Sequence, residues 1–256
     1  MKKPIQGLTS RLIITMIKCI TFDLDDTLWA VNPVIVAANK TLYSWLSENA
    51  EAFVKCHQLR DFESLKQQAL QTFPDIGHSV TMIRMKQLEI GLLQAGYPQD
   101  QALALAHQAF EVFIEARNQV ELFEHARAML EKLKQAGYMI GALSNGNADV
   151  NRVGLGDLFD FALNADGVGK EKPHPLMFEL MLEQNGLRPE QVIHIGDNPH
   201  HDIEGAKNAG LWTIWVNLDN RHWPDGLPAD QDVGCLGEIP DAVAEISARA
   251  TQRVTL

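Results

Sequence analysis

IKCITFDLDDTLW, residues 17–29, carries the strongest structural signal in the chain. Ile17–Phe22 is apolar and rich in β-branched side chains, which is typical of a buried parallel strand. The run stops at Asp23, where an Asp-x-Asp-x-Thr pattern begins, and chance produces such a match at about one position in 8,000. Two carboxylates at the end of a buried strand repel each other unless a cation or a proton intervenes. An acidic surface turn is the alternative, but the strand before it favours a charge-binding site.

Further apolar runs after residue 120 are expected to form additional strands. The clearest runs are Tyr138–Leu143, Val192–Gly196 and Trp212–Val216, and Phe159–Leu163 is a weaker one. Helical spacing of apolar residues lies between the runs, and the expected helices cover residues 126–136, 176–185 and 203–208. Strands that alternate with helices in this way predict an α/β fold with a parallel sheet.

A helical segment interrupts this alternation directly after the first strand. Residues 33–118 show helical periods, few β-branched runs, and breaks near residues 73–77 and 96–98. An insertion at that point lies at the carboxyl edge of the sheet, where ligands bind in open α/β folds, so it is suited to act as a lid. We therefore expect a core of residues 15–32 and 119–256, an all-helical cap of residues 33–118, and an N-terminal leader of residues 1–14.

Three other polar motifs accompany the later strands and helices. Ser144 opens an SNGN sequence whose hydroxyl and N–H groups suit phosphate oxygens, and Lys172 precedes a proline and a helix. Asp197 follows the run Val192–Gly196, and Asp202 comes five residues later. Each motif is weak alone, because SNG is a common turn, exposed lysines are usually solvated, and Asp202 serves equally well as a helix N-cap.

In this order the four motifs resemble those of the haloacid dehalogenase superfamily, and specifically its phosphatases. The resemblance covers the chain from Ile17 to about Asn217. It implies a Rossmann-like core, a helical C1 cap and Mg²⁺ as cofactor. The implied roles are Asp23 as nucleophile, Asp25 as general acid and then base, Ser144 and Lys172 as ligands of the phosphoryl group, and Asp23, Asp197, Asp202 and the Asp25 carbonyl as the metal site. Thr27, Asn145 and Gly146 belong to the same motifs and are added as substrate-binding candidates.

Phosphate chemistry accounts for this mixture of charges. A phosphomonoester carries about two negative charges, which repel an anionic nucleophile unless cations intervene. Mg²⁺ suits carboxylate ligands, and Lys172 adds a second positive charge. Asp25 favours a phosphatase over a dehalogenase, because displacing a halide from carbon requires no proton for the leaving group.

The DLDDTLW start, the SNGN motif and the cap sequence HSVTMIR at residues 78–84 resemble bacterial flavin mononucleotide phosphatases of the riboflavin pathway. A small phosphorylated metabolite is therefore expected as partner, either flavin mononucleotide or 5-amino-6-(5-phosphoribitylamino)uracil. Trp29 could stack on its ring, or else pack the cap onto the core. Arg84 is a candidate for a second anionic group, although exposed helical arginines are common. A phosphomutase, a pyrimidine 5′-nucleotidase and a non-catalytic phosphate-ligand sensor are the alternatives.

Composition narrows the class of protein. The 256 residues carry a net charge of −11, which argues against a broad nucleic-acid-binding face. Cys19, Cys56 and Cys235 form no CxxC pair, which favours a reducing compartment over a disulfide framework or a zinc site. The apolar stretch Leu12–Ile20 is too short and too charged to span a bilayer, so no membrane partner and a cytoplasmic location are expected. The oligomeric state stays open.

Overall fold

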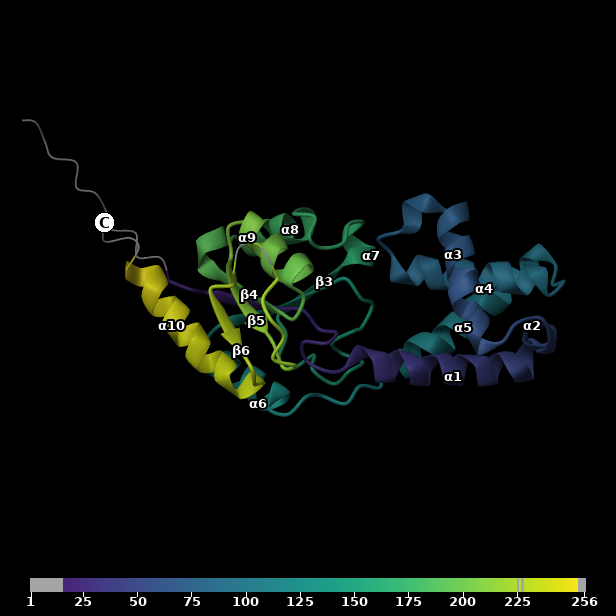
Figure 1. Ribbon diagram of the computed structural model, residues 1–256, viewed down its shortest axis with the longest axis horizontal. Helices are drawn as coiled ribbons and strands as arrows, with labels where there is room; N and C mark the ends of the chain where they lie inside the picture. The colour runs from purple at the N-terminus through teal and green to yellow at the C-terminus, as the bar shows by residue number, and fades with distance from the viewer. Residues whose placement is uncertain (1–15, 225, 227, 253–256) are drawn as a thin grey trace, which may run out of the picture.

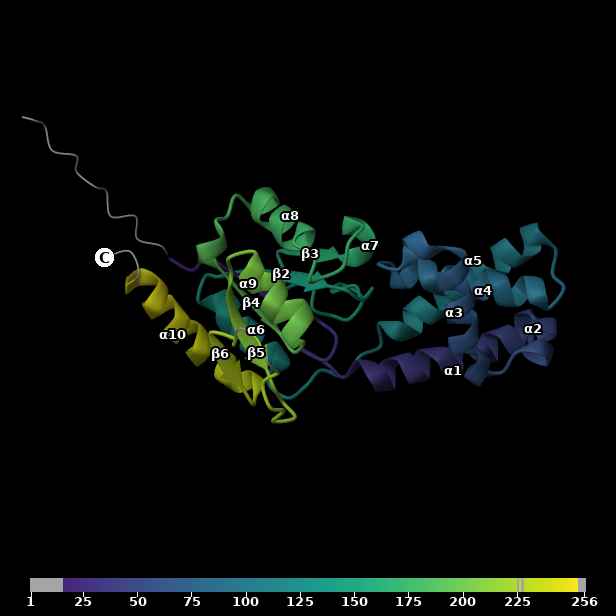
Figure 2. The same ribbon diagram turned by 45° about the horizontal axis from the view of Figure 1, so that its top comes forward.

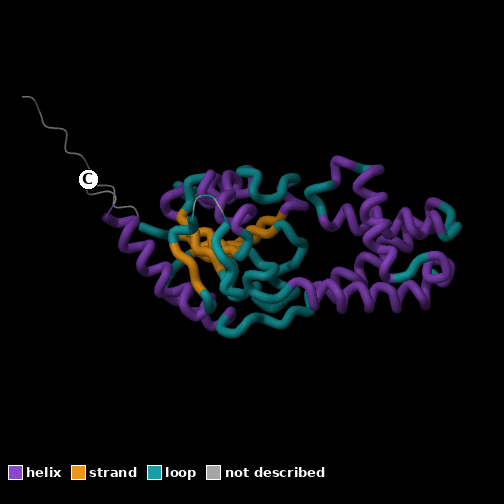
Figure 3. Tube along the Cα trace, viewed as in Figure 1, coloured by secondary structure: helices purple, strands orange, loops and turns teal. Residues whose placement is uncertain are grey.

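A computed structural model describes residues 16–224, 226 and 228–252 of the chain; the expected leader over residues 1–14 lies outside this part. The described strands form one parallel sheet in the order β3-β2-β1-β4-β5-β6 (Figures 1 and 3). They are β1 (Cys19–Phe22), β2 (Met139–Ser144), β3 (Phe161–Asn164), β4 (Val192–Gly196), β5 (Trp212–Val216) and β6 (Gln231–Val233). Phe22 of the central strand β1 pairs with Ala142 of β2 and with Ile195 of β4. The predicted α/β fold with a parallel sheet is confirmed.

Side chains alternate across each strand, so both faces of the sheet carry apolar residues. Helices cover both faces. Ile20 and Phe22 belong to the apolar cluster that includes α6 (Ala126–Gln135) and α10 (Ile239–Gln252). Cys19 belongs to the cluster on the other face, which is covered by α7 (Ala165–Val168), α8 (Leu176–Asn185) and α9 (Gly205–Asn208). Figure 2 shows α8 on the opposite side of the sheet from α6 and α10. The sheet is therefore buried on both faces, as its continuous apolar strands require.

The inserted segment folds into helices with an apolar core of their own. They are α1 (Val31–Asn49), α2 (Glu51–Cys56), α3 (Phe62–Thr72), α4 (Val80–Gln94) and α5 (Gln99–Arg117). Helix α1 buries Val34, Ala38, Leu42 and Leu46, one residue per turn along one face. Ser79 begins α4 as an N-cap whose hydroxyl accepts the Met82 N–H at 3.0 Å. Figure 1 shows these helices extending away from the sheet at one end of the molecule.

Two details differ from the sequence-based expectation. The short strand β6 was not expected, because Gln231-Asp232-Val233 offers a single apolar residue at the edge of the sheet. The helix expected at residues 203–208 begins instead as a π-helical turn, Pro199–Glu204, and continues as α9.

The carboxyl ends of β1, β2 and β4 meet at one edge of the sheet. Asp23 follows β1, Ser144 ends β2, and Asp197 follows β4. The chain passes from β1 through a short loop into α1, so this edge adjoins the cap. Within the described part of the chain, every helix is too short or too polar to cross a membrane.

Candidate active site

Asp23 is the buried residue at the end of the central strand. Its main-chain N–H donates to the carbonyl of Ile195 at 2.9 Å, which ties the residue to β4. Its Oδ1 accepts a hydrogen bond from Lys172 Nζ at 2.9 Å. Burial raises the pKa of Asp23 well above its usual value, Lys172 opposes this rise, and the nearby Asp202 adds to it. Lys172 is therefore the neighbour that favours the ionised form of this carboxylate.

Lys172 lies between two of the carboxylates and is 1% exposed. Besides Asp23, its Nζ donates to Asp202 Oδ1 at 2.6 Å and to the Leu143 carbonyl at 2.5 Å. Burial alone would lower the pKa of Lys172, but the two carboxylates outweigh burial and raise it. Lys172 therefore stays a cation at the edge of the sheet.

Asn145 holds the main chain of Lys172. Its Oδ1 accepts the Lys172 N–H at 2.7 Å, and its Nδ2 donates to the Lys172 carbonyl at 2.9 Å. Both polar groups of the amide are thus in use. The side chain of Asn145 therefore orients the lysine, while the substrate contact expected for this residue stays a prediction.

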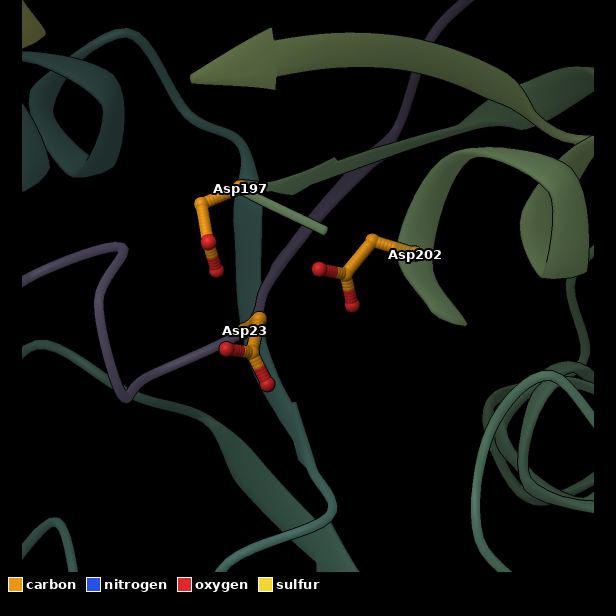
Figure 4. A group of neighbouring side chains, drawn as sticks. All are labelled: Asp23, Asp197 and Asp202. Carbon is orange, nitrogen blue, oxygen red and sulfur yellow. The ribbon is translucent and has the colours of Figure 1, made fainter. Parts of the chain in front are cut away.

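Three carboxylates gather at this edge of the sheet. Asp23, Asp197 and Asp202 each offer an oxygen within 4.8 Å of the others (Figure 4). Burial raises the pKa of Asp197 to about 6, and the charges of Asp202 and Asp26 add to the effect. Clustered oxygen donors that repel one another suit a hard divalent cation such as Mg²⁺. The donor chemistry of the site therefore fits the expected metal.

Asp202 was equally expected to bind metal or to cap a helix, and the capping alternative is wrong. It lies inside the π-helical turn Pro199–Glu204, whose N-cap is Asn198. Asn198 Oδ1 accepts the N–H groups of His200 at 3.0 Å and His201 at 2.9 Å. Asp202 Oδ2 in turn accepts the Asn198 N–H at 2.9 Å. The carboxylate is thus oriented toward the other acids while a neighbour caps the turn.

His194 of β4 supports Asp202 and was not recognised in the sequence. Its Nε2 lies 3.3 Å from Asp202 Oδ1, and its Nδ1 lies 2.9 Å from Thr21 Oγ1. An ionised carboxylate only accepts hydrogen bonds, so Nε2 carries the proton and Nδ1 accepts from the threonine. Burial lowers the pKa of His194, which keeps it neutral. Burial alone would raise the pKa of Asp202, but Lys172 and His194 outweigh burial and lower it.

Thr27 orients Asp197. Its hydroxyl accepts the Asp197 N–H at 3.1 Å and lies 3.4 Å from Asp197 Oδ1. The side chain is fully buried. Thr27 therefore supports the loop that carries Asp197, and its expected role in substrate binding stays a prediction. Ser144 is also buried, and its Oγ accepts the Gly146 N–H at 3.0 Å, which shapes the turn after β2.

The Asp25 carboxylate is held from two directions. Its Oδ1 accepts the indole N–H of Trp29 at 2.9 Å, and its Oδ2 forms an ion pair with Arg117 of α5. Gly146 lies against this pair and leaves no room for a Cβ atom there. Trp29 is 0% exposed and packs in the apolar core, so stacking of its ring on a ligand is a wrong expectation. Its packing role is the one that the structure supports.

A cavity of about 510 Å³ opens beside Asp25 and Gly146 and runs among α1, α3, α4 and α5. Arg84 lines it from α4, half-buried instead of exposed. Its guanidinium carbon lies 4.2 Å from the centre of the Phe113 ring, and its Nη1 donates to Gln87 Oε1 at 2.9 Å. The structure therefore brings Arg84 and Gly146 to one cavity with Asp25.

Arg117 and Asn147 complete the contact between cap and core. Asn147 Oδ1 accepts from Arg117 Nε at 3.2 Å, and its Nδ2 donates to Thr81 Oγ1 of α4 at 3.1 Å. An arginine in the last turn of a helix is ordinarily explained by the helix dipole, so the sequence offered no signal for Arg117. Asn147 stood in the SNGN motif without an assigned partner.

Sequence comparisons relate the chain to known proteins. Residues 17–210 match a family model described as haloacid dehalogenase-like hydrolase. The chain is 31% identical over 231 residues to the 5-amino-6-(5-phospho-D-ribitylamino)uracil phosphatase YigB of Escherichia coli (strain K12), covering 89% of this chain and 96% of that protein. It is 30% identical over 211 residues to a glyceraldehyde 3-phosphate phosphatase of Pyrococcus furiosus, covering 78% of this chain and 80% of the relative.

Solved structures include a similar fold at higher identity. The crystal structure of a 2-haloacid dehalogenase from Pseudomonas syringae pv. Tomato DC3000 is 37% identical, with a TM-score of 0.85. The match covers 90% of this chain and 99% of that one.

Proposed function

The chain belongs to the haloacid dehalogenase-like hydrolase family, and we propose that it is a Mg²⁺-dependent phosphatase in which Asp23 forms a covalent aspartyl-phosphate. One observation carries the proposal. Asp23 stands at the end of a buried strand with Lys172 on its Oδ1 and two further carboxylates within 4.8 Å. That arrangement supplies an anionic nucleophile, one lysine cation and the oxygen donors for a divalent cation, and a phosphate dianion requires such positive charge around it.

Each charged residue has a role in the proposed reaction. Asp23 attacks phosphorus through a carboxylate oxygen while the ester bond to the leaving alcohol breaks. Lys172 offsets negative charge on the phosphoryl oxygens, and the Ser144 hydroxyl binds one of them. Asp23, Asp197 and the carbonyl of Asp25 would hold Mg²⁺, with Asp202 supporting the site. When bound, the metal neutralises charge on the phosphoryl group during transfer.

Asp25 is proposed to move the proton. Its carboxylate reaches the cavity where a leaving group lies, and its side chain is 19% exposed. In the first step it gives a proton to the departing alcohol oxygen. In the second step it takes a proton from the water that attacks the aspartyl-phosphate, which restores Asp23 and releases inorganic phosphate.

We propose 5-amino-6-(5-phospho-D-ribitylamino)uracil as the substrate, with flavin mononucleotide as the next candidate. The named activity of the Escherichia coli relative supports this choice, because the match extends over 96% of that protein and thus includes its counterpart of the cap. The cavity of about 510 Å³ lies within the size range of pockets that enclose a heterocyclic leaving group.

A dehalogenase is a second candidate, favoured by the 37% identity to the Pseudomonas syringae protein. Displacement of halide from carbon requires neither a proton donor beside the leaving group nor a divalent cation. Asp23 would still serve as the nucleophile, but Asp25 and the two acids clustered with Asp23, Asp197 and Asp202, would then have no role, which argues for phosphate transfer. Chloride release from 2-chloropropionate in the absence of phosphatase activity would support the dehalogenase instead.

A panel of phosphate esters tests the proposal. Phosphate release would be measured for the ribitylaminouracil phosphate, flavin mononucleotide, a pyrimidine 5′-nucleotide, glyceraldehyde 3-phosphate and a glucose phosphate. The highest kcat/KM is expected for the first, with loss in EDTA and recovery with Mg²⁺. Full activity in EDTA would exclude the metal, and a rearranged phosphosugar without free phosphate would indicate a phosphomutase. Recovery of activity in the cytoplasmic fraction of cells would test the expected location.

A further inference from the structure

The cavity beside Asp25 is lined by several turns of α1 and by polar groups from more than one helix. Val31 begins α1 beside the catalytic loop, where its N–H donates to Asp26 Oδ1 at 2.9 Å. Asn39 lines the same cavity eight residues further along α1, which corresponds to about 12 Å of helix. A leaving group that fills the space must therefore be long as well as polar at its far end.

Arg117 offers a free donor at the shallow end of this cavity. It is 1% exposed, and two of its nitrogen atoms bind Asp25 and Asn147. Its remaining nitrogen, Nη1, is buried without a hydrogen-bond partner among residues 16–252 as far as these are described. A buried N–H group of this kind favours a ligand oxygen, since leaving it unpaired costs free energy.

Arg84 offers a second guanidinium, deeper in the cap. It lies over Phe113, which precedes Arg117 by four residues in α5 and is thus about one helical turn further from Asp25. No carboxylate of the described residues lies within 4.0 Å of its guanidinium, although burial lowers the pKa of Arg84 to about 10. Glu63 lines the same cavity and opposes this lowering of the pKa by its charge, but it forms no direct ion pair with Arg84. A desolvated guanidinium without a directly bonded carboxylate favours a carbonyl or anionic oxygen of a ligand.

Asn39 supplies the complementary acceptor. Its Oδ1 is buried and has no hydrogen-bond partner within the described part of the chain. A ligand N–H would satisfy it. The apolar side chains of Ile35, Ile83 and Phe113 line the space between these polar groups and suit a flat ring.

We propose that Arg84 and Asn39 select the ring of the leaving group: a heterocycle with adjacent C=O and N–H groups, joined to the phosphate by a polyhydroxyl chain. Arg84 binds the ring carbonyl, Asn39 accepts from the ring N–H, and Arg117 Nη1 binds a hydroxyl of the chain near the ester. The proposal rests on the phosphatase function and names the part of the cavity that discriminates among phosphate esters.

Two substrates separate ring recognition from phosphate transfer. The ribitylaminouracil phosphate carries both chain and ring, whereas ribitol 5-phosphate carries the chain alone. Arg84→Met removes the charge but keeps a long side chain over Phe113, and Asn39→Leu removes the acceptor at similar volume. Each variant is expected to raise KM for the ring-bearing substrate by roughly tenfold or more, with a much smaller change for ribitol 5-phosphate.

Two controls make the outcome decisive. Lys86→Gln removes a cation from the same helix outside the cavity and should leave both substrates unaffected. Arg84→Lys keeps a charge and should restore part of the ring preference. Equal losses on both substrates, or no loss on either, would overturn the assignment of ring recognition. A wild-type protein inactive on both substrates and on all the other esters would instead overturn the phosphatase proposal.

Discussion

Replacing Gly146 by alanine tests the placement of Asp25. An ideal Cβ at Gly146 would lie under 3.0 Å from Asp25 Oδ2, whereas ordinary van der Waals contact begins at 3.4 Å. The same atom would lie 3.3 Å from Arg117 Nη2 and 3.4 Å from Ser144 Oγ, so the methyl group has no free space to enter. The carboxylate must therefore shift by at least about 0.4 Å, away from its ion pair.

The size of the effect follows from this displacement. A misplacement of about 1 Å in a reacting group costs roughly a hundredfold in rate, so kcat should fall roughly tenfold to a hundredfold. Overpacking should also lower the free energy of unfolding by about 1–3 kcal/mol. Steady-state phosphate release and thermal unfolding measure the two effects. Gly234→Ala is the matched control, because an added Cβ at Gly234 meets nothing within 4 Å.

A double variant identifies the route of the effect. Asp25→Ala removes the carboxylate that the new methyl group would meet. If Gly146 acts through Asp25, the Gly146→Ala/Asp25→Ala protein should be no slower than Asp25→Ala. A folded Gly146→Ala protein with wild-type kcat, or losses that simply add in the double variant, would refute the reasoning.

Three further predictions follow from the charges at the site. Lys172→Met leaves Asp23 and Asp202 without their shared cation, so the free energy of unfolding at pH 8 without Mg²⁺ should fall by about 3–5 kcal/mol; an unchanged unfolding temperature would contradict this. Mg²⁺ binding requires Asp197 in its carboxylate form, and the pKa of Asp197 is raised to about 6. The affinity for Mg²⁺, measured by calorimetry, should therefore fall roughly tenfold per pH unit below pH 6. A constant affinity from pH 5 to 7 would argue against the metal site. His194→Leu removes a hydrogen bond from Asp202 and should lower kcat roughly tenfold to a hundredfold with little change in KM. His194→Gln keeps a hydrogen-bond donor and should keep most of the activity. Equal activity of the two variants would contradict a positioning role for His194.

The fold could be predicted because its main signals are local. Each central strand is a continuous apolar run, since a parallel sheet is buried on both faces, and each run stops where the chain leaves the sheet. Asp23 and Asp197 were expected to meet because the family resemblance implies one metal site for both, and the structure brings them together since β1 and β4 end at the same edge. The edge strand β6 and the π-helical turn at Pro199–Glu204 lack such signals. A strand with one apolar residue, or a single helical turn, is too short to show a periodic pattern of apolar residues in the sequence.

The roles of individual side chains were harder to predict than their presence at the site. Thr27 and Asn145 were found in the right motifs, but their hydrogen bonds serve Asp197 and Lys172, a choice that depends on side-chain direction in the folded chain. Arg117 meets Asp25 across 92 residues of sequence, and no motif spacing connects them. Contacts between cap and core are therefore the part of the site that required the structure.

Trapping the covalent intermediate tests the central claim most directly. The enzyme would be mixed with the ribitylaminouracil phosphate, quenched within one turnover and treated with borohydride, which reduces an aspartyl-phosphate to homoserine. Mass spectrometry of the peptide that contains residues 17–29 would locate the change. We predict homoserine at Asp23 in the wild type and none in Asp23→Asn, which should release no phosphate. Phosphate release by Asp23→Asn at the wild-type rate, or its release by the wild type with Asp23 unmodified throughout the turnover, would contradict the account.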